Sequence, residues 1–138
     1  MRKRIYLAAP IHQKADFDAN AVLLTQLRDE GYDVWSPQEA GIASDVAKQT
    51  GRSLAEVRKE FMKIDLSAMK NCDICLAYLG REREPSQGML WEMGWFSAMN
   101  KPVIIFNPFN NKFTLMAEFT CDFYVTDFED VVRQIDGM

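Results

Sequence analysis

The chain alternates short apolar runs with segments of helical periodicity, and this alternation restricts its fold more than any other feature. Residues 4–9 form an apolar run, and residues 15–30 then repeat apolar side chains at helical spacing up to Gly31. Residues 32–35 return to a strand-like run. We therefore predict a β-α-β unit at the start of the chain, and such a unit joins two parallel strands.

The rest of the chain continues this alternation, and several of its strand-like runs are apolar throughout, as is typical of parallel sheets buried on both faces. Further strands are expected at 73–79, 101–106 and 123–126, and helices at 53–70, 88–99 and 127–137, after a polar loop at 38–52 with one short helix. The predicted fold is α/β: a single-domain, doubly wound (Rossmann- or flavodoxin-like) parallel sheet of about five strands with helices on both faces. A length of 138 residues suits one domain over residues 1–138.

Charge and hydropathy exclude two classes of partner. The net charge is −4 and the sequence has no long Lys/Arg stripe, whereas binding of a nucleic-acid backbone needs a basic face. The first apolar run ends at Pro10, far short of a signal peptide, and no segment approaches the roughly 18 apolar residues of a membrane span. We therefore expect a cytoplasmic protein with no nucleic-acid and no membrane partner.

The three cysteines are expected to be packed thiols and not metal ligands. Cys72 and Cys75 form a C-x-x-C pair, but in a strand their side chains would point to opposite faces. A zinc shell needs further ligands, and His12 is the only histidine of the chain. Cys121 is the third cysteine, so the cysteines cannot all form disulfide pairs. No metal and no other cofactor are expected.

The carboxyl ends of the strands locate a candidate site, because ligands of open parallel sheets bind beyond these ends. The first end carries Ala8 and Ala9, whose small side chains let a ligand approach the backbone. The other ends lie at residues 36–39, 79–88 and 107–108. This reasoning gives a location and not an activity, because many such sheets have no catalytic role.

Glu92 is the most informative residue of the chain. It is the only ionisable side chain in the apolar helix expected at 88–99. A carboxylate in such surroundings costs stability unless a partner holds it, and the Tyr6 hydroxyl is the expected donor. Gly94 weakens the same helix by about 1 kcal/mol relative to Ala, which close packing against it would explain. The alternative is that Glu92 reaches solvent at the edge of its helix.

Asp65 lies on the same face of the helix expected at 53–70 as a stripe of apolar side chains. At about 100° per residue, Asp65 falls within this stripe and therefore faces the core. The stripe consists of Leu54, Val57, Phe61, Ile64 and Ala68. Because this helix leads into the third strand and Glu92 follows that strand, the two carboxylates could face one cleft. The alternative for Asp65 is an ion pair with a loop.

Paired carboxyl groups are the groups that glycosyl transfer uses. One oxygen attacks the anomeric carbon, and the other group moves a proton. Around these two residues the chain resembles the nucleoside 2-deoxyribosyltransferase family over essentially its whole length. The matching segments are residues 5–10 (Ile-Tyr-Leu-Ala-Ala-Pro), 34–39 (Val-Trp-Ser-Pro-Gln-Glu), Asp65-Leu66 with Asp73, Pro85-x-x-Gly88-x-x-x-Glu92-x-Gly94, and Thr114-Leu115-Met116.

The resemblance implies that Glu92 matches the family's nucleophile and Asp65 the acid that helps to protonate the leaving base. It also implies that the matching segments contact the substrate. Ile11 and His12, which directly follow the first of these segments, would line the base pocket. A surface role for His12, the only histidine, is the alternative.

Further implications concern the base and the assembly. Gln38 and Glu39 would border the nucleobase. The family builds its sites across subunit contacts, so the resemblance implies a homo-oligomer, a dimer or higher, in which Thr114 reaches the substrate of a neighbouring chain.

Two departures from the family pattern bear on the substrate. Ser86 stands six residues before Glu92, where the transferases carry Asp, and Thr114 stands where they carry Asn. These changes resemble the related nucleoside 5′-monophosphate N-glycosidases, because a hydroxyl does not repel a phosphate as a carboxylate does. Pro10, in contrast, resembles the transferases, since those hydrolases have a serine there.

The favoured function is transfer of a 2-deoxyribosyl group from a 2′-deoxynucleoside to an acceptor nucleobase, through a covalent glutamyl-sugar intermediate on Glu92. One alternative is hydrolysis of (deoxy)nucleoside 5′-monophosphates to base and sugar phosphate by the same residues. A second alternative is a non-catalytic nucleotide-sensing module with Ser86 and Thr114 as phosphate ligands. Residues 81–84 (Arg-Glu-Arg-Glu) are interpreted as a solvated loop, with a lid or phosphate contact as the alternative.

Overall fold

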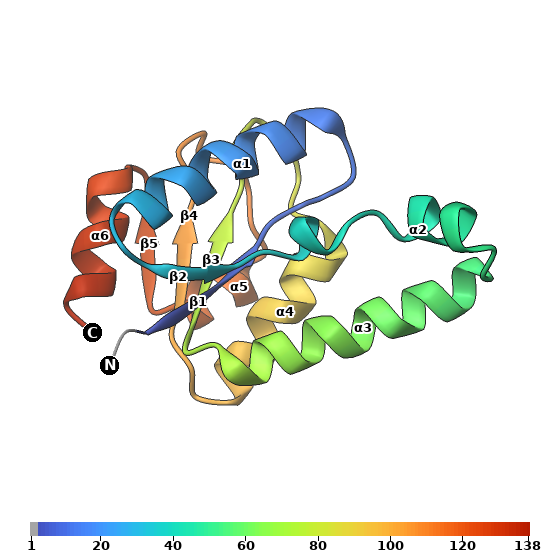
Figure 1. Ribbon diagram of the computed structural model, residues 1–138. Coiled ribbons are helices and arrows are strands. Elements are labelled where there is room, and N and C mark those ends of the chain that lie inside the picture. The colour runs from blue at the N-terminus through green and yellow to red at the C-terminus, as the bar shows by residue number, and fades with distance from the viewer. Residues whose placement is uncertain (1–2) are drawn as a thin grey trace.

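The computed structural model describes residues 3–138, and within them five parallel strands form one sheet (Figure 1). The strand order is β2-β1-β3-β4-β5. The register places Tyr6 of β1 beside Trp35 of β2 and Cys75 of β3. The strands are β1 (Arg4–Ala8), β2 (Asp33–Trp35), β3 (Ile74–Tyr78), β4 (Val103–Phe106) and β5 (Phe123–Val125).

Helices cover both faces of this sheet, as the sequence predicts. Ile5 and Leu7 of β1 pack into a core with α1 and α6, whereas Tyr6 and Ala8 face a second core formed with α3, α4 and α5. Side chains therefore alternate between two buried layers, which explains the continuous apolar runs of the sequence. The helices are α1 (Lys14–Asp29), α2 (Ala43–Thr50), α3 (Leu54–Asn71), α4 (Gln87–Ala98), α5 (Leu115–Thr120), α6 (Phe128–Asp136) and the short 3-10 helix η1 (Pro37–Ala40).

The helices that carry the candidate carboxylates begin where local capping groups fix them. The Ser53 hydroxyl accepts a hydrogen bond from the backbone N–H of Glu56 at 3.2 Å at the start of α3. Ser86 caps α4 in the same way, through the backbone N–H of Met89 at 3.3 Å. Gly51, with φ +68°, ends α2 in the left-handed conformation that glycine adopts without strain. These caps set where Asp65 and Glu92 fall along their helices.

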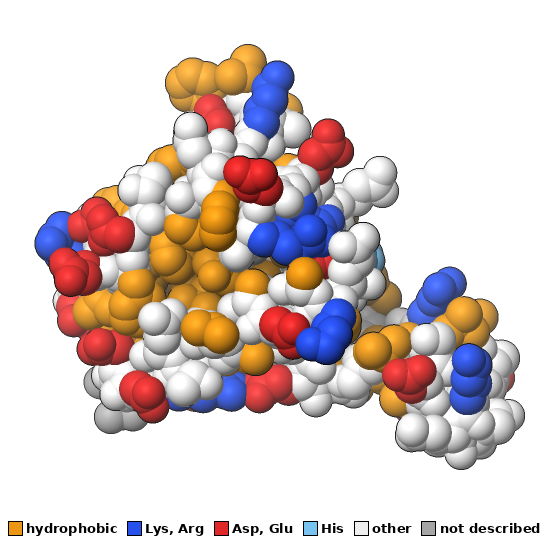
Figure 2. Space-filling view, turned by 90° about the horizontal axis from the view of Figure 1, so that it is seen from above, with side chains coloured by type: hydrophobic (Ala, Val, Ile, Leu, Met, Phe, Trp, Pro, Cys, Tyr) orange, Lys and Arg blue, Asp and Glu red, His pale blue; other side chains and the backbone are white. Residues whose placement is uncertain are grey.

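One part of the helix prediction is wrong, because the apolar stripe of α3 does not face the core along its whole length. Val57 and Met69 are buried, but Leu54 and Ile64 are exposed. For Leu54 the reason is visible in Figures 1 and 2: α2 and the first half of α3 extend away from the body of the molecule as a separate lobe. Only the later half of α3 covers the sheet, and Ile64 lies on the exposed side of that half.

Two smaller differences concern α5 and the cysteines. Helix α5 was not expected from the sequence; it is short, and its apolar side chains are largely exposed. Cys72 precedes β3 as the residue that ends α3, so it shares one core with Cys75 and does not point to the opposite face. Among residues 3–138 no three His, Cys, Asp or Glu side chains form a potential metal site. None of the described helices is long and apolar enough to cross a membrane.

Candidate active site

A pocket of about 340 Å³ opens between α3, α4 and the carboxyl end of β1. This is the position that the topology favours, since the strand order changes direction between β1 and β3. Seven of the residues predicted from the sequence line it together: Ala9, Ile11, His12, Asp65, Ser86, Gly88 and Glu92. The other lining residues are Pro37, Met62, Leu66, Met69, Met89 and Trp91, so the walls are mainly apolar.

Glu92 points from α4 toward the core side of the pocket and is held by a partner. Its Oε2 atom accepts a hydrogen bond from the Tyr6 hydroxyl. Burial raises the pKa of Glu92 to about 7, the Tyr6 hydrogen bond acts in the opposite direction, and the nearby Asp65 carboxylate raises the pKa further. Glu92 therefore does not reach freely into solvent, and the donor is the residue that the sequence predicted.

Asp65 faces the same pocket from α3. Burial raises its pKa to about 6. No Lys or Arg lines the pocket within residues 3–138, so no cationic side chain of the lining offsets the repulsion between the two carboxylates. Two such groups titrate as a pair, and near pH 6–7 the pair holds one proton. Glu92 has the higher pKa of the two, so attack by Glu92 as a nucleophile requires that this shared proton lies on Asp65 when the substrate is bound.

Tyr6 forms the floor beneath Glu92. It is fully buried in β1, and its ring stacks on Trp35 at 5.2 Å between centroids and packs against Phe96 at 5.5 Å. Burial and the adjacent Glu92 carboxylate raise the pKa of Tyr6 well above its usual range. The hydroxyl therefore stays protonated and acts as a fixed donor to Glu92.

Besides Tyr6, four residues predicted from the sequence do not line this pocket. Ala8 is fully buried in β1, where it pairs with Ala77. Thr114 is exposed and caps α5 through the backbone N–H of Ala117 at 3.2 Å. Glu39 forms an ion pair with Arg28 at 2.5 Å, with the side chains of both residues half-exposed.

Gln38, the fourth, lies in η1 with its amide turned inward. Its Nε2 atom donates to the carbonyl of Phe17 at 3.3 Å. Its Oε1 atom is buried and has no hydrogen-bond partner among residues 3–138.

Sequence reasoning missed several of the apolar lining residues. Met62 and Met69 stand three residues before and four residues after Asp65, on one side of α3, and Trp91 precedes Glu92 on α4. Helical spacing from the two carboxylates would have found the two methionines, because residues three or four apart share a helix face.

The strand order 2-1-3-4-5 is that of a flavodoxin-like α/β protein. Its pocket lies where the strand order changes direction and carries two carboxyl groups, as is typical of a small-molecule site. The family model of the nucleoside 2-deoxyribosyltransferases matches residues 5–133. The chain belongs to this family, whose members transfer glycosyl groups or cleave N-glycosidic bonds. The resemblance seen in the sequence is thereby confirmed.

Comparison with solved structures agrees. The chain is similar to a 2-deoxyribosyltransferase from Bacillus psychrosaccharolyticus, with 28% identity, a TM-score of 0.77, and coverage of 93% of this chain and 89% of that chain. Two structures with 20% identity share the fold: a conserved protein from Enterococcus faecalis V583, with a TM-score of 0.80 and 99% of both chains covered, and a CMP N-glycosidase from Clostridium botulinum, with a TM-score of 0.61 and 97% and 99% covered. No curated protein sequence matches the chain significantly.

Proposed function

We propose that the protein cleaves the N-glycosidic bond of a 2′-deoxynucleoside and transfers the 2-deoxyribosyl group to an acceptor nucleobase. Glu92 attacks C1′ as the bond to the base breaks, and the base leaves with a proton that Asp65 supplies. The acceptor base then attacks C1′ and displaces the Glu92 carboxylate with net retention, while the Asp65 carboxylate takes up the proton that the acceptor base loses. The observation that carries the proposal is the pair of carboxyl groups with raised pKa values in one pocket, with Tyr6 bound to Glu92.

The pocket supports this chemistry through its charge and its apolar walls. An oxocarbenium-like transition state is stabilised by a carboxylate near C1′, and the low dielectric of an apolar pocket strengthens that interaction. The flat side chains of His12 and Trp91 lie in the lining and suit a planar base. We assign the base contacts to Ile11 and His12.

The remaining substrate contacts are assigned by position. Ala9 and Gly88 lie in the lining, where small residues let the sugar approach the backbone. Ala8, which is fully buried beside Ala9, is assigned a contact through its neighbour only. Gln38 and Glu39 are assigned to the border of the base site because they directly follow Pro37, which lines the pocket.

The test is base exchange. The protein is incubated with deoxyinosine and adenine, and chromatography measures the formation of deoxyadenosine and hypoxanthine. Glu92→Ala should abolish exchange and leave the circular dichroism spectrum unchanged, whereas Glu129→Ala, a change at an exposed position on α6, should keep activity. Full exchange by the Glu92 variant would refute the nucleophile.

A second candidate, hydrolysis of nucleoside 5′-monophosphates, is favoured by one observation. Ser86 lines the pocket in place of an aspartate, so no carboxylate at that position repels a phosphate. Incubation with deoxynucleoside monophosphates, with detection of free base and sugar phosphate, distinguishes this reaction from transfer. Tight binding without turnover of either substrate would indicate a sensing module.

We also propose that the protein forms a homo-oligomer. The side chains of Leu115, Met116 and Phe119 on α5 are apolar and highly exposed, and Thr114 begins this helix. An apolar face of this kind is typical of an interface. Association through α5 would bring Thr114 of one chain toward the substrate of its neighbour.

A further inference from the structure

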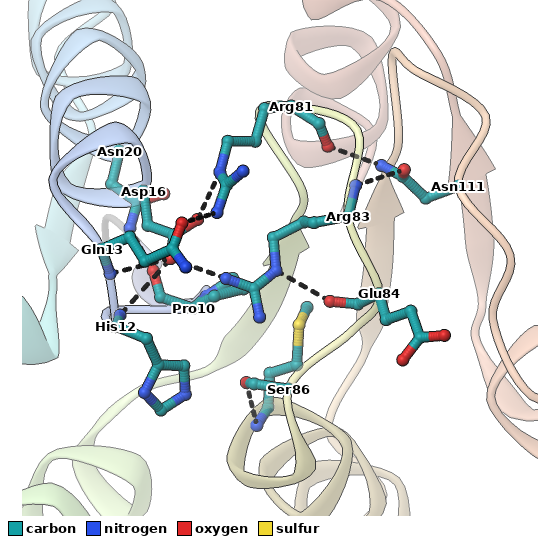
Figure 3. Close-up of polar contacts among 11 residues, drawn as sticks. Pro10, His12, Gln13, Asp16, Asn20, Arg81, Arg83, Glu84, Ser86 and Asn111 are labelled. Carbon is teal, nitrogen blue, oxygen red and sulfur yellow. Dashed lines mark hydrogen bonds and ion pairs between the residues drawn. The ribbon is translucent and has the colours of Figure 1, made fainter.

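A cluster of polar contacts lies beside the pocket without lining it (Figure 3). At its centre is Asp16 in the first turn of α1, the only charged residue that is buried among residues 3–138, with 2% of its side chain exposed. Its two carboxylate oxygens accept hydrogen bonds from Arg81 Nε at 2.8 Å and Arg83 Nη1 at 2.6 Å. The backbone N–H of Gln13 donates to it at 3.2 Å.

The two arginines explain how Asp16 can be buried. Burial alone would raise the pKa of Asp16, but the hydrogen bonds from Arg81 and Arg83 outweigh it and hold the pKa below its ordinary value. A buried carboxylate without such partners would be strongly destabilising. Asp16 is therefore ionised, and it binds two side chains of the loop that was expected from the sequence to be solvated.

The same loop is held from its other side by backbone contacts. The Asn111 side chain accepts a hydrogen bond from the backbone N–H of Arg83 and donates one to the carbonyl of Arg81, both at 2.9 Å. Asn107, fully buried at the end of β4, donates to the carbonyl of Asn111 at 2.8 Å. The loop after β3 is thus fixed between the loops that follow β1 and β4.

This arrangement joins two walls of the pocket. Ile11 and His12 precede Gln13 in the loop after β1, and Ser86 and Gly88 follow Arg83 at the start of α4. Figure 3 shows Arg83 lying between Asp16 and Ser86, with His12 nearby. Asp65 and Glu92, in contrast, lie on α3 and deeper in α4, and neither is bonded to the cluster.

We propose that Asp16 is a positioning residue: through Arg81 and Arg83 it holds the wall with Ser86 against the wall with Ile11 and His12, and so fixes the width of the substrate pocket. The proposal rests on the proposed function for its activity readout. Loss of the clamp should impair substrate binding more than the chemical step, because the reacting carboxyl groups are held elsewhere.

Asp16→Asn removes the charge with little change in size, and Asp18→Asn is the matched control. Asp18 lies on the same helix, is exposed, and forms an ion pair with Lys14 at 2.7 Å. In base exchange with deoxyinosine and adenine, Asp16→Asn should raise KM at least tenfold and change kcat less than threefold. Asp18→Asn should change neither. A lower melting temperature with KM unchanged, or an equal effect of Asp18→Asn, would show that Asp16 only stabilises the fold.

A second variant covers the case in which Asp16→Asn does not fold. Arg81→Gln leaves Asp16 paired with Arg83 and should raise KM in the same direction by a smaller factor. Unchanged KM in this folded variant would overturn the proposal.

Amide hydrogen exchange provides a readout that needs no turnover. In the substrate-free protein, the amides of residues 80–88 should exchange at least tenfold faster in Asp16→Asn, or in Arg81→Gln, than in Asp18→Asn. Unchanged exchange refutes the clamp whatever the activity. If the wild type releases no base, the proposed reaction fails, and the clamp is then judged by calorimetric binding of adenine: weaker binding in Asp16→Asn supports it, and unchanged affinity refutes it.

Discussion

Ser86 has two roles at the scale of one residue, since it caps α4 and also lines the pocket. Ser86→Asp keeps the cap, because Asp is as good as Ser at that position. It also places a negative charge beside the substrate. Repulsion of about 3 kcal/mol, or roughly 100-fold, is expected for a phosphate nearby. The variant should therefore lower the ratio of kcat/KM for a deoxynucleoside monophosphate to kcat/KM for the deoxynucleoside by that factor.

Ser86→Asn is the control for this prediction. Asn also caps a helix but carries no charge, so it should leave the ratio of the two kcat/KM values within threefold of the wild type. Equal losses in both variants would mean that the size of the side chain, and not its charge, decides the substrate.

The pair of carboxyl groups gives a second prediction at this scale, in the dependence of activity on pH. Glu92 must be ionised to attack, so kcat/KM should fall as the pH drops through its pKa of about 7. Asp65 raises this pKa, and Asp65→Asn should therefore move the acid limb to lower pH. The Tyr6 hydrogen bond lowers it, and Tyr6→Phe should move the limb to higher pH.

A suitable substrate for these profiles is 7-methyl-2′-deoxyguanosine. Its base is already cationic, so it can leave without receiving a proton from the enzyme. Asp65→Asn should then keep most of its activity on this substrate and lose most of it on deoxyinosine. Shifts of the same sign in Asp65→Asn and Tyr6→Phe, or equal losses on both substrates, would contradict the assigned roles.

At the scale of elements, replacement of glycine by alanine should have opposite effects on the free energy of unfolding at two positions, Gly80 and Gly94. A Cβ atom at Gly80, which follows β3, would lie 2.7 Å from the Cβ of Ala19 on α1 and from the ring of Tyr78. Gly80→Ala should therefore destabilise the protein by about 1–3 kcal/mol through overpacking. Urea denaturation followed by circular dichroism measures the free energy of unfolding.

Gly94 is the matched position, and it corrects an expectation. The sequence suggested that something packs closely against it, but among residues 3–138 a Cβ atom at Gly94 would meet no atom within 4 Å beyond its chain neighbours and the backbone of its own helix. Gly94→Ala should thus raise the free energy of unfolding by up to about 1 kcal/mol, through helix propensity. Loss of stability in Gly94→Ala, or none in Gly80→Ala, would contradict this account of the packing.

Most elements could be predicted from the sequence because local signals set them. Ser53 and Ser86 provide caps, Gly51 ends α2, and apolar runs identify buried strands. Helix α5 could not be predicted in this way, because its apolar side chains face outward and give no inward stripe. The pocket followed from topology, whereas the bonds of Arg81 and Arg83 join residues 65 and 67 positions from Asp16, a pairing that no local pattern contains.

At the scale of the whole molecule, exposed apolar side chains are distributed unevenly. The lobe of α2 and the first half of α3 stands apart from the body, as Figure 2 shows. Ile42, which begins α2, and Met62 on this half of α3 are exposed, and α5 exposes another apolar face. Large apolar side chains in such number on one small chain are unfavourable in water, and a second copy of the chain would cover them. Met62 also lines the pocket, so a copy of the chain that covers the lobe would help to enclose the substrate.

The final prediction tests this association at α5. Phe119 is 83% exposed, so Phe119→Lys should not disturb the folded monomer but should place a charge in the proposed interface. We expect sedimentation equilibrium to show a multiple of the chain mass for the wild type and a smaller mass for the variant. Base exchange should fall along with the mass, because Thr114 at the start of the same helix would no longer reach a neighbouring pocket. Val22→Lys, at a position 61% exposed on α1, should change neither quantity. A monomeric wild type, or a Phe119 variant of unchanged mass and activity, would refute association through α5.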